Sequence, residues 1–246
     1  MKRSHFIRNS AIAGLGLSFF PQMSFAASQE PFSRDQLIGK SNPDIIGESY
    51  TSKMHRETKQ ALSKMKEAAL EDGIKIEVVS AFRSFQRQKE IYEAKYVTFL
   101  NDGSTPEEAI AQIIEYSTIP GTSRHHWGTD LDLIDANVPR PESVLQPGNF
   151  HGKGPYCKLK EWLDSNSENF GFYEVYTDEP QRKGFKYEPW HFSYAPVAIP
   201  MLRAYRKLDI KRLLRETKIK GYDHFSDAFI DRYTSENILD INPKLL

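Results

Sequence analysis

Hydrophobic positions along the chain change period several times, and these changes predict alternating helices and strands. Between residues 52 and 72 the apolar positions follow helical spacing, and Gly73 ends the run. Residues 74–80 alternate between apolar and polar side chains, as in a strand. A second helix is predicted over about residues 85–100, where large apolar and aromatic side chains again recur at helical spacing.

The next elements are marked by capping and turn residues. Thr105 and Pro106, followed by two glutamates, predict a helix N-terminus, because a hydroxyl caps the helix and acids favour its first turn. Residues 129–135 alternate and are predicted as a strand, whereas residues 136–156 carry proline, glycine and asparagine and are predicted as a surface loop.

In the last third of the chain, a helix ended by Gly171 leads into a predicted strand over residues 172–176. A second strand is predicted over residues 184–194, made irregular by Pro189. The charged tail is predicted to begin with one amphipathic helix over residues 197–214. Together these elements predict an α+β fold, with a small, largely antiparallel sheet and helices packed on it.

The chain divides into four predicted parts. Residues 1–26 have a basic start, an apolar stretch of ten residues and a small-x-small cleavage site, which predict a secretory signal peptide. Residues 27–50 are polar and are predicted as a linker and entry arm, residues 51–200 as the main domain, and residues 201–246 as a helical extension packed on it. We therefore expect export to the periplasmic or extracellular cell-envelope space, with no stable membrane span after cleavage; the alternative is an uncleaved N-terminal anchor.

Composition narrows the function classes. Residues 1–26 contain three basic and no acidic residues, so their removal from a chain with 33 of each leaves 30 basic and 33 acidic residues, a net charge of −3. This balance argues against a nucleic-acid partner, which favours basic proteins. The single cysteine excludes an internal disulfide and a cysteine-rich metal site, so any metal must be held by His, Asp or Glu. We expect a monomer.

The stretch from residue 120 to 133 carries the most chemistry. His125 and His126 sit in a turn-like segment, and Asp130 and Asp132 follow with the same strand parity, so both acids face one side. A catalytic zinc site has three protein ligands and an open position. His125 and Asp132 are two candidate ligands, although histidines are more often ordinary polar residues than ligands.

The remaining part of such a site must come from elsewhere in the chain. The best donor is His191, with Glu188 three residues before it. A carboxylate beside a zinc-bound water can act as general base and then carry the proton to the leaving amine. From residue chemistry alone, a metal site and a set of structural histidines both remain open.

The spacing of these residues further supports a metal site. The pattern Ser123-x-His125-x-x-Gly128-x-x-x-Asp132, followed by Glu188-x-Trp190-His191, strongly resembles the VanY-type zinc D-alanyl-D-alanine carboxypeptidases. That family is grouped with VanX-like dipeptidases and the hedgehog signalling domain. The resemblance covers about residues 45–200, and the segment from residue 80 to Gln88 also looks like the family's sequence.

By resemblance, His125, Asp132 and His191 bind one Zn²⁺ ion per chain in a cleft on the sheet, and Glu188 is the general acid/base. The further roles implied are an oxyanion-type contact from Arg83 to the scissile carbonyl, and substrate contacts from Ser123 and Gln88; we expect Trp190 to form a wall of the substrate site.

One position departs from the family, which usually has alanine where this chain has Asp130. A second acid here is either an alternative ligand or, as we favour, a partner that orients an imidazole or makes a structural hydrogen bond. For His126 we favour a structural or rim position.

The sequence thus predicts an exported zinc carboxypeptidase that removes the C-terminal D-alanine from peptidoglycan stem peptides. An L,D-carboxypeptidase and a D,D-endopeptidase are alternatives on the same scaffold. A non-catalytic, zinc-stabilised module that binds cell-wall peptides is a further alternative, against which Glu188 argues, since binding alone has no need of that carboxylate. The residue that binds the substrate's C-terminal carboxylate stays unassigned.

Overall fold

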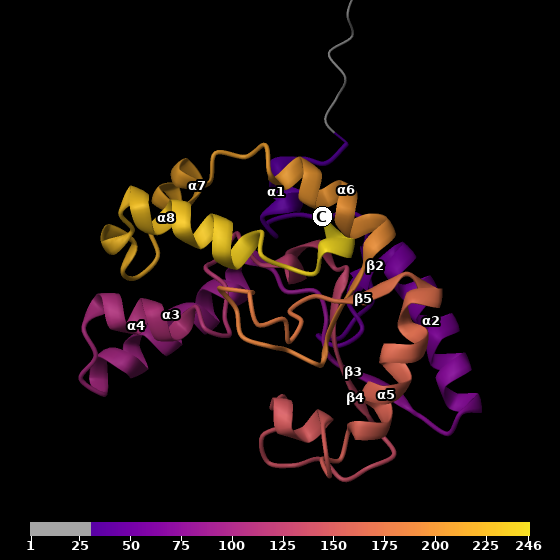
Figure 1. The fold of residues 1–246 in the computed structure, drawn as a ribbon. Coiled ribbons are helices and arrows are strands. Elements are labelled where there is room, and N and C mark those ends of the chain that lie inside the picture. Colours follow the sequence, from indigo (N-terminus) through magenta and orange to yellow (C-terminus); the bar gives the residue numbers. More distant parts are fainter. Residues whose placement is uncertain (1–30) are drawn as a thin grey trace, which may run out of the picture. The chain divides into compact units, whose positions relative to one another are not determined.

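Four antiparallel strands form the central sheet of the protein, in the order β3–β4–β6–β5. Their bounds are Ile76–Ser80 (β3), Asp130–Asp135 (β4), His191–Tyr194 (β6) and Phe172–Glu174 (β5). The computed structural model describes residues 31–246, which group as one unit (Figure 1). The predicted signal peptide, residues 1–26, lies outside the described residues, and so do the first residues of the predicted linker.

Helices surround this sheet. They are α1 (Arg34–Leu37), α2 (Arg56–Glu71), α3 (Phe85–Asn101), α4 (Pro106–Ile113), α5 (Cys157–Asn166), α6 (Ala195–Tyr205), α7 (Ile210–Thr217) and α8 (Asp227–Tyr233). Short 3₁₀ turns cover Arg124–Trp127 (η1), Pro147–Phe150 (η2), Ser167–Phe170 (η3), Tyr222–His224 (η4) and Pro243–Leu245 (η6), and a π turn covers Thr234–Ile238 (η5). A two-stranded ladder pairs β1 (Ile45–Ile46) with β2 (Met54–His55). No helix within residues 31–246 is long and apolar enough to cross a bilayer.

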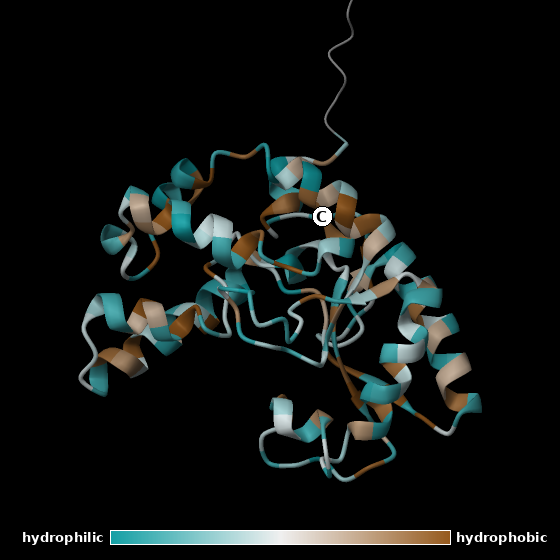
Figure 2. Cartoon of the chain, in the orientation of Figure 1, coloured by the Kyte–Doolittle hydropathy of each residue, from teal (hydrophilic) through white to brown (hydrophobic). Residues whose placement is uncertain are grey.

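One apolar cluster lies between the sheet and helices α2 and α5. Leu131 and Leu133 of β4 join it together with Met65 of α2 and Leu163 of α5, all fully buried. Because side chains alternate along a strand, burying these two leucines turns Asp130 and Asp132 to the other face. Figure 2 shows hydrophobic and hydrophilic residues mixed along each helix, as expected for helices with one buried side.

A second apolar cluster joins α3 and α4 to the C-terminal helices. The tail also makes polar contacts to the turn that precedes the candidate site. Tyr233 Oη accepts a hydrogen bond from the backbone of Ile119 at 3.0 Å and lies 2.8 Å from Thr122 Oγ1. Tyr205 Oη donates to the carbonyl of Gly121 at 2.9 Å. The C-terminal helices therefore hold the turn at residues 119–122 through the hydroxyl groups of Tyr205 and Tyr233.

The sequence predicted most elements and missed or merged others. The strand predicted over residues 184–194 is wrong in length, since only His191–Tyr194 pairs with the sheet. The single helix predicted over residues 197–214 is also wrong: α6 ends at Tyr205, and α7 starts after Asp209, whose carboxylate caps it by accepting from Arg212 N at 2.9 Å.

The segment predicted as a linker contains structure that the sequence did not indicate. It forms α1 and β1, and it buries Leu37 and Ile38 in the core. The carbonyl of Leu37 accepts a hydrogen bond from the indole nitrogen of Trp127 at 3.0 Å. This part of the chain therefore supports the turn η1, which carries two of the candidate histidines.

Candidate metal centre

The ladder between β4 and β6 brings the two halves of the predicted site together. Asp132 is the direct partner of His191, and Asp130 is the direct partner of Ser193. Both acids face the same side of the sheet, as their spacing predicted. Two segments that are far apart in the sequence thus meet on neighbouring strands.

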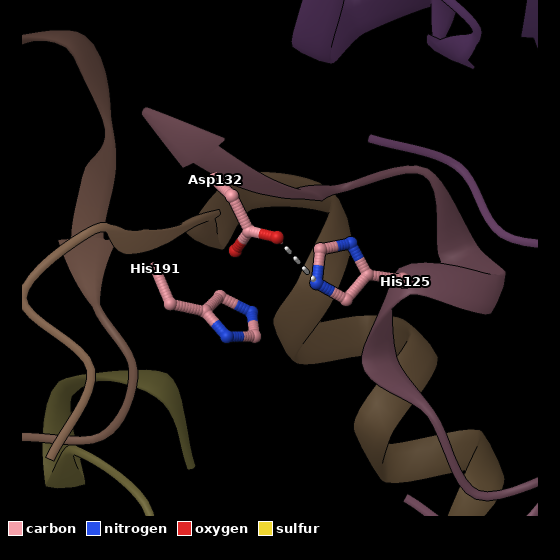
Figure 3. A group of neighbouring side chains, drawn as sticks. All are labelled: His125, Asp132 and His191. Carbon is pink, nitrogen blue, oxygen red and sulfur yellow. Dashed lines mark ion pairs between the residues drawn. The ribbon is translucent and has the colours of Figure 1, made fainter. Parts of the chain in front are cut away.

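His125 reaches the same place from the turn η1. Gly128 ends this turn in the left-handed region, at φ +70°, and a Cβ there would lie 2.7 Å from the backbone nitrogen of His55, so the position favours glycine. His125 Nδ1 lies 2.8 Å from the carbonyl oxygen of Ala81, which leaves Nε2 directed at Asp132 Oδ2, 3.7 Å away (Figure 3).

The three predicted ligands form a convergent group. His125, Asp132 and His191 each offer one ligand atom, and these atoms lie within 4.8 Å of one another (Figure 3). All three residues are buried, and Asp132 Oδ1 has no hydrogen-bond partner in the described chain. Burial lowers the pKa of His125 to about 3, so its ring is neutral at pH 7. Two imidazoles and a carboxylate with an unsatisfied oxygen are a suitable donor set for zinc.

His191 has a carboxylate on each ring nitrogen. Its Nε2 lies 3.0 Å from Asp130 Oδ2, and its Nδ1 lies 2.8 Å from Glu188 Oε2. Burial alone would lower the pKa of His191, but the hydrogen bonds to Asp130 and Glu188 outweigh it and raise the pKa to about 10. In the metal-free protein the His191 ring is therefore an imidazolium at neutral pH.

Asp130 holds the His191 ring rather than joining the convergent group. It is fully buried and accepts hydrogen bonds from Arg124 Nε at 2.8 Å and from Ser193 Oγ at 2.5 Å. Burial would raise the pKa of Asp130, but Arg124 and His191 bring it below its usual range, so the carboxylate stays charged. This geometry favours the predicted role in which Asp130 orients an imidazole over that of an alternative ligand.

Arg83 lies beside this group and is fixed by neutral partners. Its Nη1 donates to Gln88 Oε1 at 2.8 Å, and its Nη2 donates to Ser80 Oγ at 3.0 Å. Gln88 is fully buried, and its Nε2 donates to the carbonyl of Thr118 at 2.7 Å. Gln88 is not one of the residues that line the cleft, and it contacts the Arg83 guanidinium.

The group opens into a cleft of about 360 Å³. Ser123 lines it, and its buried Oγ has no hydrogen-bond partner among the described residues. Trp190 forms part of the wall and packs on Phe150 with ring centroids 5.7 Å apart. Glu188 also lines the cleft, so the predicted catalytic carboxylate and the three convergent residues share one space.

His126 has a structural position. It is fully buried, its Nδ1 lies 2.6 Å from the carbonyl oxygen of Arg83, and its Nε2 accepts from the backbone of Gly121 at 3.0 Å. The ring therefore ties the turn at residue 121 to the backbone that carries Arg83.

Sequence reasoning missed several side chains that line the cleft, and three of them carry a charge or an aromatic ring beside the convergent group. These are Lys95, Arg124 and Tyr176, whose ring meets His191 edge-on at a centroid distance of 5.1 Å. Lys95 follows Gln88 by seven residues on α3, and this helical spacing is the signal that could have identified it. For Tyr176 the sequence offers no comparable signal, because the cleft wall forms only on folding.

Comparison with known proteins identifies the family. The sequence model of the family described as VanY, D-alanyl-D-alanine carboxypeptidase, matches residues 51–197, more than half of the chain. The chain belongs to this family. A D-alanyl-D-alanine carboxypeptidase of Enterococcus faecalis is 30% identical over 132 residues, which is 53% of this chain and 44% of that protein. An uncharacterised protein of Haemophilus influenzae is 38% identical over 82 residues, 32% of this chain and 63% of that protein. The chain thus matches less than two thirds of the length of either relative.

Solved structures of the VanY family share the fold. A mutant of the vancomycin resistance D,D-pentapeptidase VanY from a VanB-type cassette, in complex with Zn(II), superposes with a TM-score of 0.50 at 26% identity, covering 68% of this chain and 85% of that one. VanYB in complex with D-alanine-D-alanine gives a TM-score of 0.52 at 24% identity, covering 73% and 92%. The predicted α+β fold and the resemblance to the VanY family are both confirmed.

Proposed function

We propose that this protein is an exported zinc carboxypeptidase that removes the C-terminal D-alanine from peptidoglycan stem peptides. The observation that carries the proposal is the convergence of His125, Asp132 and His191 in a cleft that Glu188 also lines. Membership of the VanY D-alanyl-D-alanine carboxypeptidase family supports the reaction class, and the Zn(II) complex of a VanY relative supports the metal. We propose one Zn²⁺ ion per chain and a monomer.

The three convergent residues would hold the ion. His125 would offer Nε2, because its Nδ1 is held at Ala81. His191 has a carboxylate on each ring nitrogen. It would offer Nδ1 with Glu188 released from it, because Asp130 on Nε2 is also fixed by Arg124 and Ser193. Zinc in such a site lowers the pKa of a coordinated water to about 7 and polarises a carbonyl group. The donor set fits a cation, because the buried Oδ1 of Asp132 has no hydrogen-bond partner among the described residues.

Glu188 would move the proton in this reaction. Its Oε2 lies 2.8 Å from His191 Nδ1, so the carboxylate is next to the proposed ligand atom. From there it can take a proton from the attacking water and deliver it to the amine of the departing D-alanine. The carboxylate is therefore proposed as the general acid/base, as the family resemblance implies.

The remaining side chains would bind and orient the peptide. Arg83 would stabilise negative charge on the scissile carbonyl oxygen, with Gln88 and Ser80 fixing its guanidinium. Ser123 would contact the peptide backbone through its unpartnered Oγ. Trp190 would exclude water as part of the cleft wall. For Gln88 we propose support of Arg83 in place of direct substrate contact.

Two alternatives remain within the proposal. L,D-carboxypeptidase and D,D-endopeptidase activities would use the same residues with a differently shaped peptide. A non-catalytic peptide-binding module is less well supported, because it leaves the position of Glu188 beside His191 without a purpose.

The test is product release from defined muropeptides. Purified protein loaded with zinc is incubated with pentapeptide and tetrapeptide muropeptides, with and without a chelator, and products are identified by mass spectrometry. We expect chelator-sensitive release of one D-alanine from the pentapeptide. Release of D-alanine from the tetrapeptide alone would favour L,D-carboxypeptidase activity. If zinc is bound and neither muropeptide loses D-alanine, the proposed carboxypeptidase activity is refuted.

A further inference from the structure

Besides its histidines, the cleft is lined by three basic side chains of the described residues, and two of these have polar partners. Arg83 is held by Gln88 and Ser80. Arg124 is neutralised by Asp130, 2.8 Å from its Nε. The third is Lys95, which forms no hydrogen bond or ion pair with any residue between 31 and 246.

The position of Lys95 follows from the geometry of α3. Gln88, Ile91 and Lys95 are spaced three and four residues apart, so they lie along one stripe of the helix. Ile91 and Lys95 both line the cleft. With a rise of about 1.5 Å per residue, the Cα of Lys95 lies roughly 10 Å along the helix from that of Gln88, which supports Arg83. An extended peptide advances about 3.3–3.6 Å per residue, so an offset of this size corresponds to about three residues. Lys95 would therefore contact a part of the substrate other than the scissile carbonyl.

The surroundings of Lys95 favour an anion. The side chain is half-buried, and burial together with nearby Arg83 lowers its pKa, whereas Glu188 raises it. Glu188 itself is 2.8 Å from His191 Nδ1 and makes no ion pair with Lys95. The same cleft contains Thr118, whose buried Oγ1 lacks a hydrogen-bond partner in the described chain. A partly desolvated ammonium without a counterion is unfavourable, and a bound carboxylate would relieve it.

We propose that Lys95 is the carboxylate-binding residue of the cleft and pairs with a carboxylate of the bound peptide. This inference rests on the proposed function, since it assumes a peptide substrate. The carboxylate comes either from the C-terminal residue or from a side chain within the peptide. Both sources present the same chemistry to the ammonium, and the experiment separates them.

The experiment measures binding without turnover. Zinc-loaded Glu188→Gln protein is titrated calorimetrically with acetylated L-Lys-D-Ala-D-Ala, whose only carboxylate is C-terminal, and with its C-terminal amide. A second pair is the L-Ala-γ-D-Glu-L-Lys-D-Ala-D-Ala pentapeptide and the form with the glutamate carboxylate as a carboxamide. These four titrations are repeated with Lys95→Met and Lys95→Arg added. The matched control is Lys89→Met, on the same helix, because Lys89 does not line the cleft and pairs with Glu93 at 3.8 Å.

We expect free carboxylate to bind about 10- to 100-fold more tightly than its amide in one of the two pairs, the range typical of a hydrogen bond to a charged group. Lys95→Met abolishes this preference, whereas Lys95→Arg and Lys89→Met retain it. The pair that shows the preference identifies the carboxylate. Zinc content and near-ultraviolet circular dichroism establish that each variant is folded.

The inference is overturned if Lys95→Met keeps the preference in the pair that shows it, or if the protein with Lys95 intact shows no preference in either pair. Failure of the proposed function gives a different result. Suppose that the unmodified zinc-loaded protein releases no D-alanine while the Lys95-dependent preference persists. Carboxylate binding by Lys95 is then supported, and the proposed carboxypeptidase activity is refuted.

Discussion

Asp132 and His191 face each other directly across the β4–β6 ladder. This pairing fixes their separation through the backbone hydrogen bonds of two neighbouring strands, not through flexible side-chain contacts. A site built on paired strands is pre-organised, so little conformational entropy is lost when a ligand binds. His125 completes the group from a turn that is itself held by Gly128 and by the carbonyl of Ala81.

We predict that Asp132→Asn greatly lowers the zinc content of the purified protein, because the neutral amide is a far weaker ligand than the carboxylate. The matched control is Asp135→Asn, at the far end of β4, where the carboxylate accepts backbone hydrogen bonds from Lys75 and Asn137. Elemental analysis should give about one zinc per chain for the control and much less for Asp132→Asn. Equal zinc content in the two variants would exclude Asp132 as a ligand.

Glu188→Gln should separate metal binding from catalysis. The amide keeps the shape of the side chain but cannot accept a proton, so we expect zinc content to be retained while kcat for D-alanine release falls by about 10²- to 10⁴-fold. Glu168→Gln serves as the control, since the Glu168 side chain is exposed and pairs with Lys244 at the surface. Retained activity in Glu188→Gln would remove this carboxylate from the mechanism.

Arg83 should act on kcat rather than on metal binding. Arg83→Met removes the donor proposed for the carbonyl oxygen, and kcat should drop by roughly 10²- to 10³-fold with zinc retained. Gln88→Leu should cause a smaller loss, because Arg83 stays present but loses the hydrogen bond to Gln88 Oε1. Steady-state kinetics beside zinc analysis measure both effects. A Gln88→Leu variant that raises KM alone would instead support direct substrate contact by Gln88.

The sequence could predict half-sites but not their assembly. The parity of Asp130 and Asp132 predicts one face of a strand, and the structure agrees because β4 is regular. The pairing of β4 with β6 depends on contacts between residues distant in the chain, and periodicity carries no information about such contacts. For the same reason the predicted strand over residues 184–194 is too long, since only His191–Tyr194 joins the ladders of the sheet and the preceding residues contain a bend and a turn.

The pair of Asp130 and Arg124 shows a second limit of sequence reasoning. The sequence identifies Asp130 as a departure from the family, and one of the two roles it suggests for Asp130 is to orient an imidazole. Its buried partner was not anticipated, because an arginine beside two histidines reads as a surface residue. Only the fold shows that Arg124 is 4% exposed and donates to Asp130 and Ser193.

Asp130→Asn should weaken zinc binding without removing a ligand. Loss of the charged partner of His191 Nε2 is expected to lower zinc affinity by about 10- to 100-fold. The variant should also destabilise the fold by about 3–5 kcal/mol, because Arg124 is left as a buried, uncompensated charge. Competition with a chelating dye gives the affinity, and urea denaturation gives the stability.

A double variant, Arg124→Leu with Asp130→Ala, separates these two effects. It removes both charges, so much of the stability should return while the zinc affinity stays low. If the single variant Asp130→Asn binds zinc as tightly as the unmodified protein, Asp130 does not orient the ligand.

Zinc affinity should increase with pH across the neutral range. In the metal-free protein, hydrogen bonds to Asp130 and Glu188 raise the pKa of His191 to about 10, against an ordinary value of 6.5. His191 must lose a proton before it can bind a metal, so below its raised pKa each zinc ion displaces about one proton from the ring. His125 contributes no such proton, because burial lowers its pKa to about 3. The logarithm of the apparent affinity should therefore rise by about one unit per pH unit between pH 7 and 8.5, where an unperturbed histidine would already be neutral.

Titrations in a series of buffers measure this slope, and calorimetry in buffers of different ionisation enthalpy counts the proton released. Asp130→Asn, which removes one of the two stabilising carboxylates, should flatten the slope. An affinity that is constant from pH 7 to 8.5 in the unmodified protein would show that His191 is already neutral there.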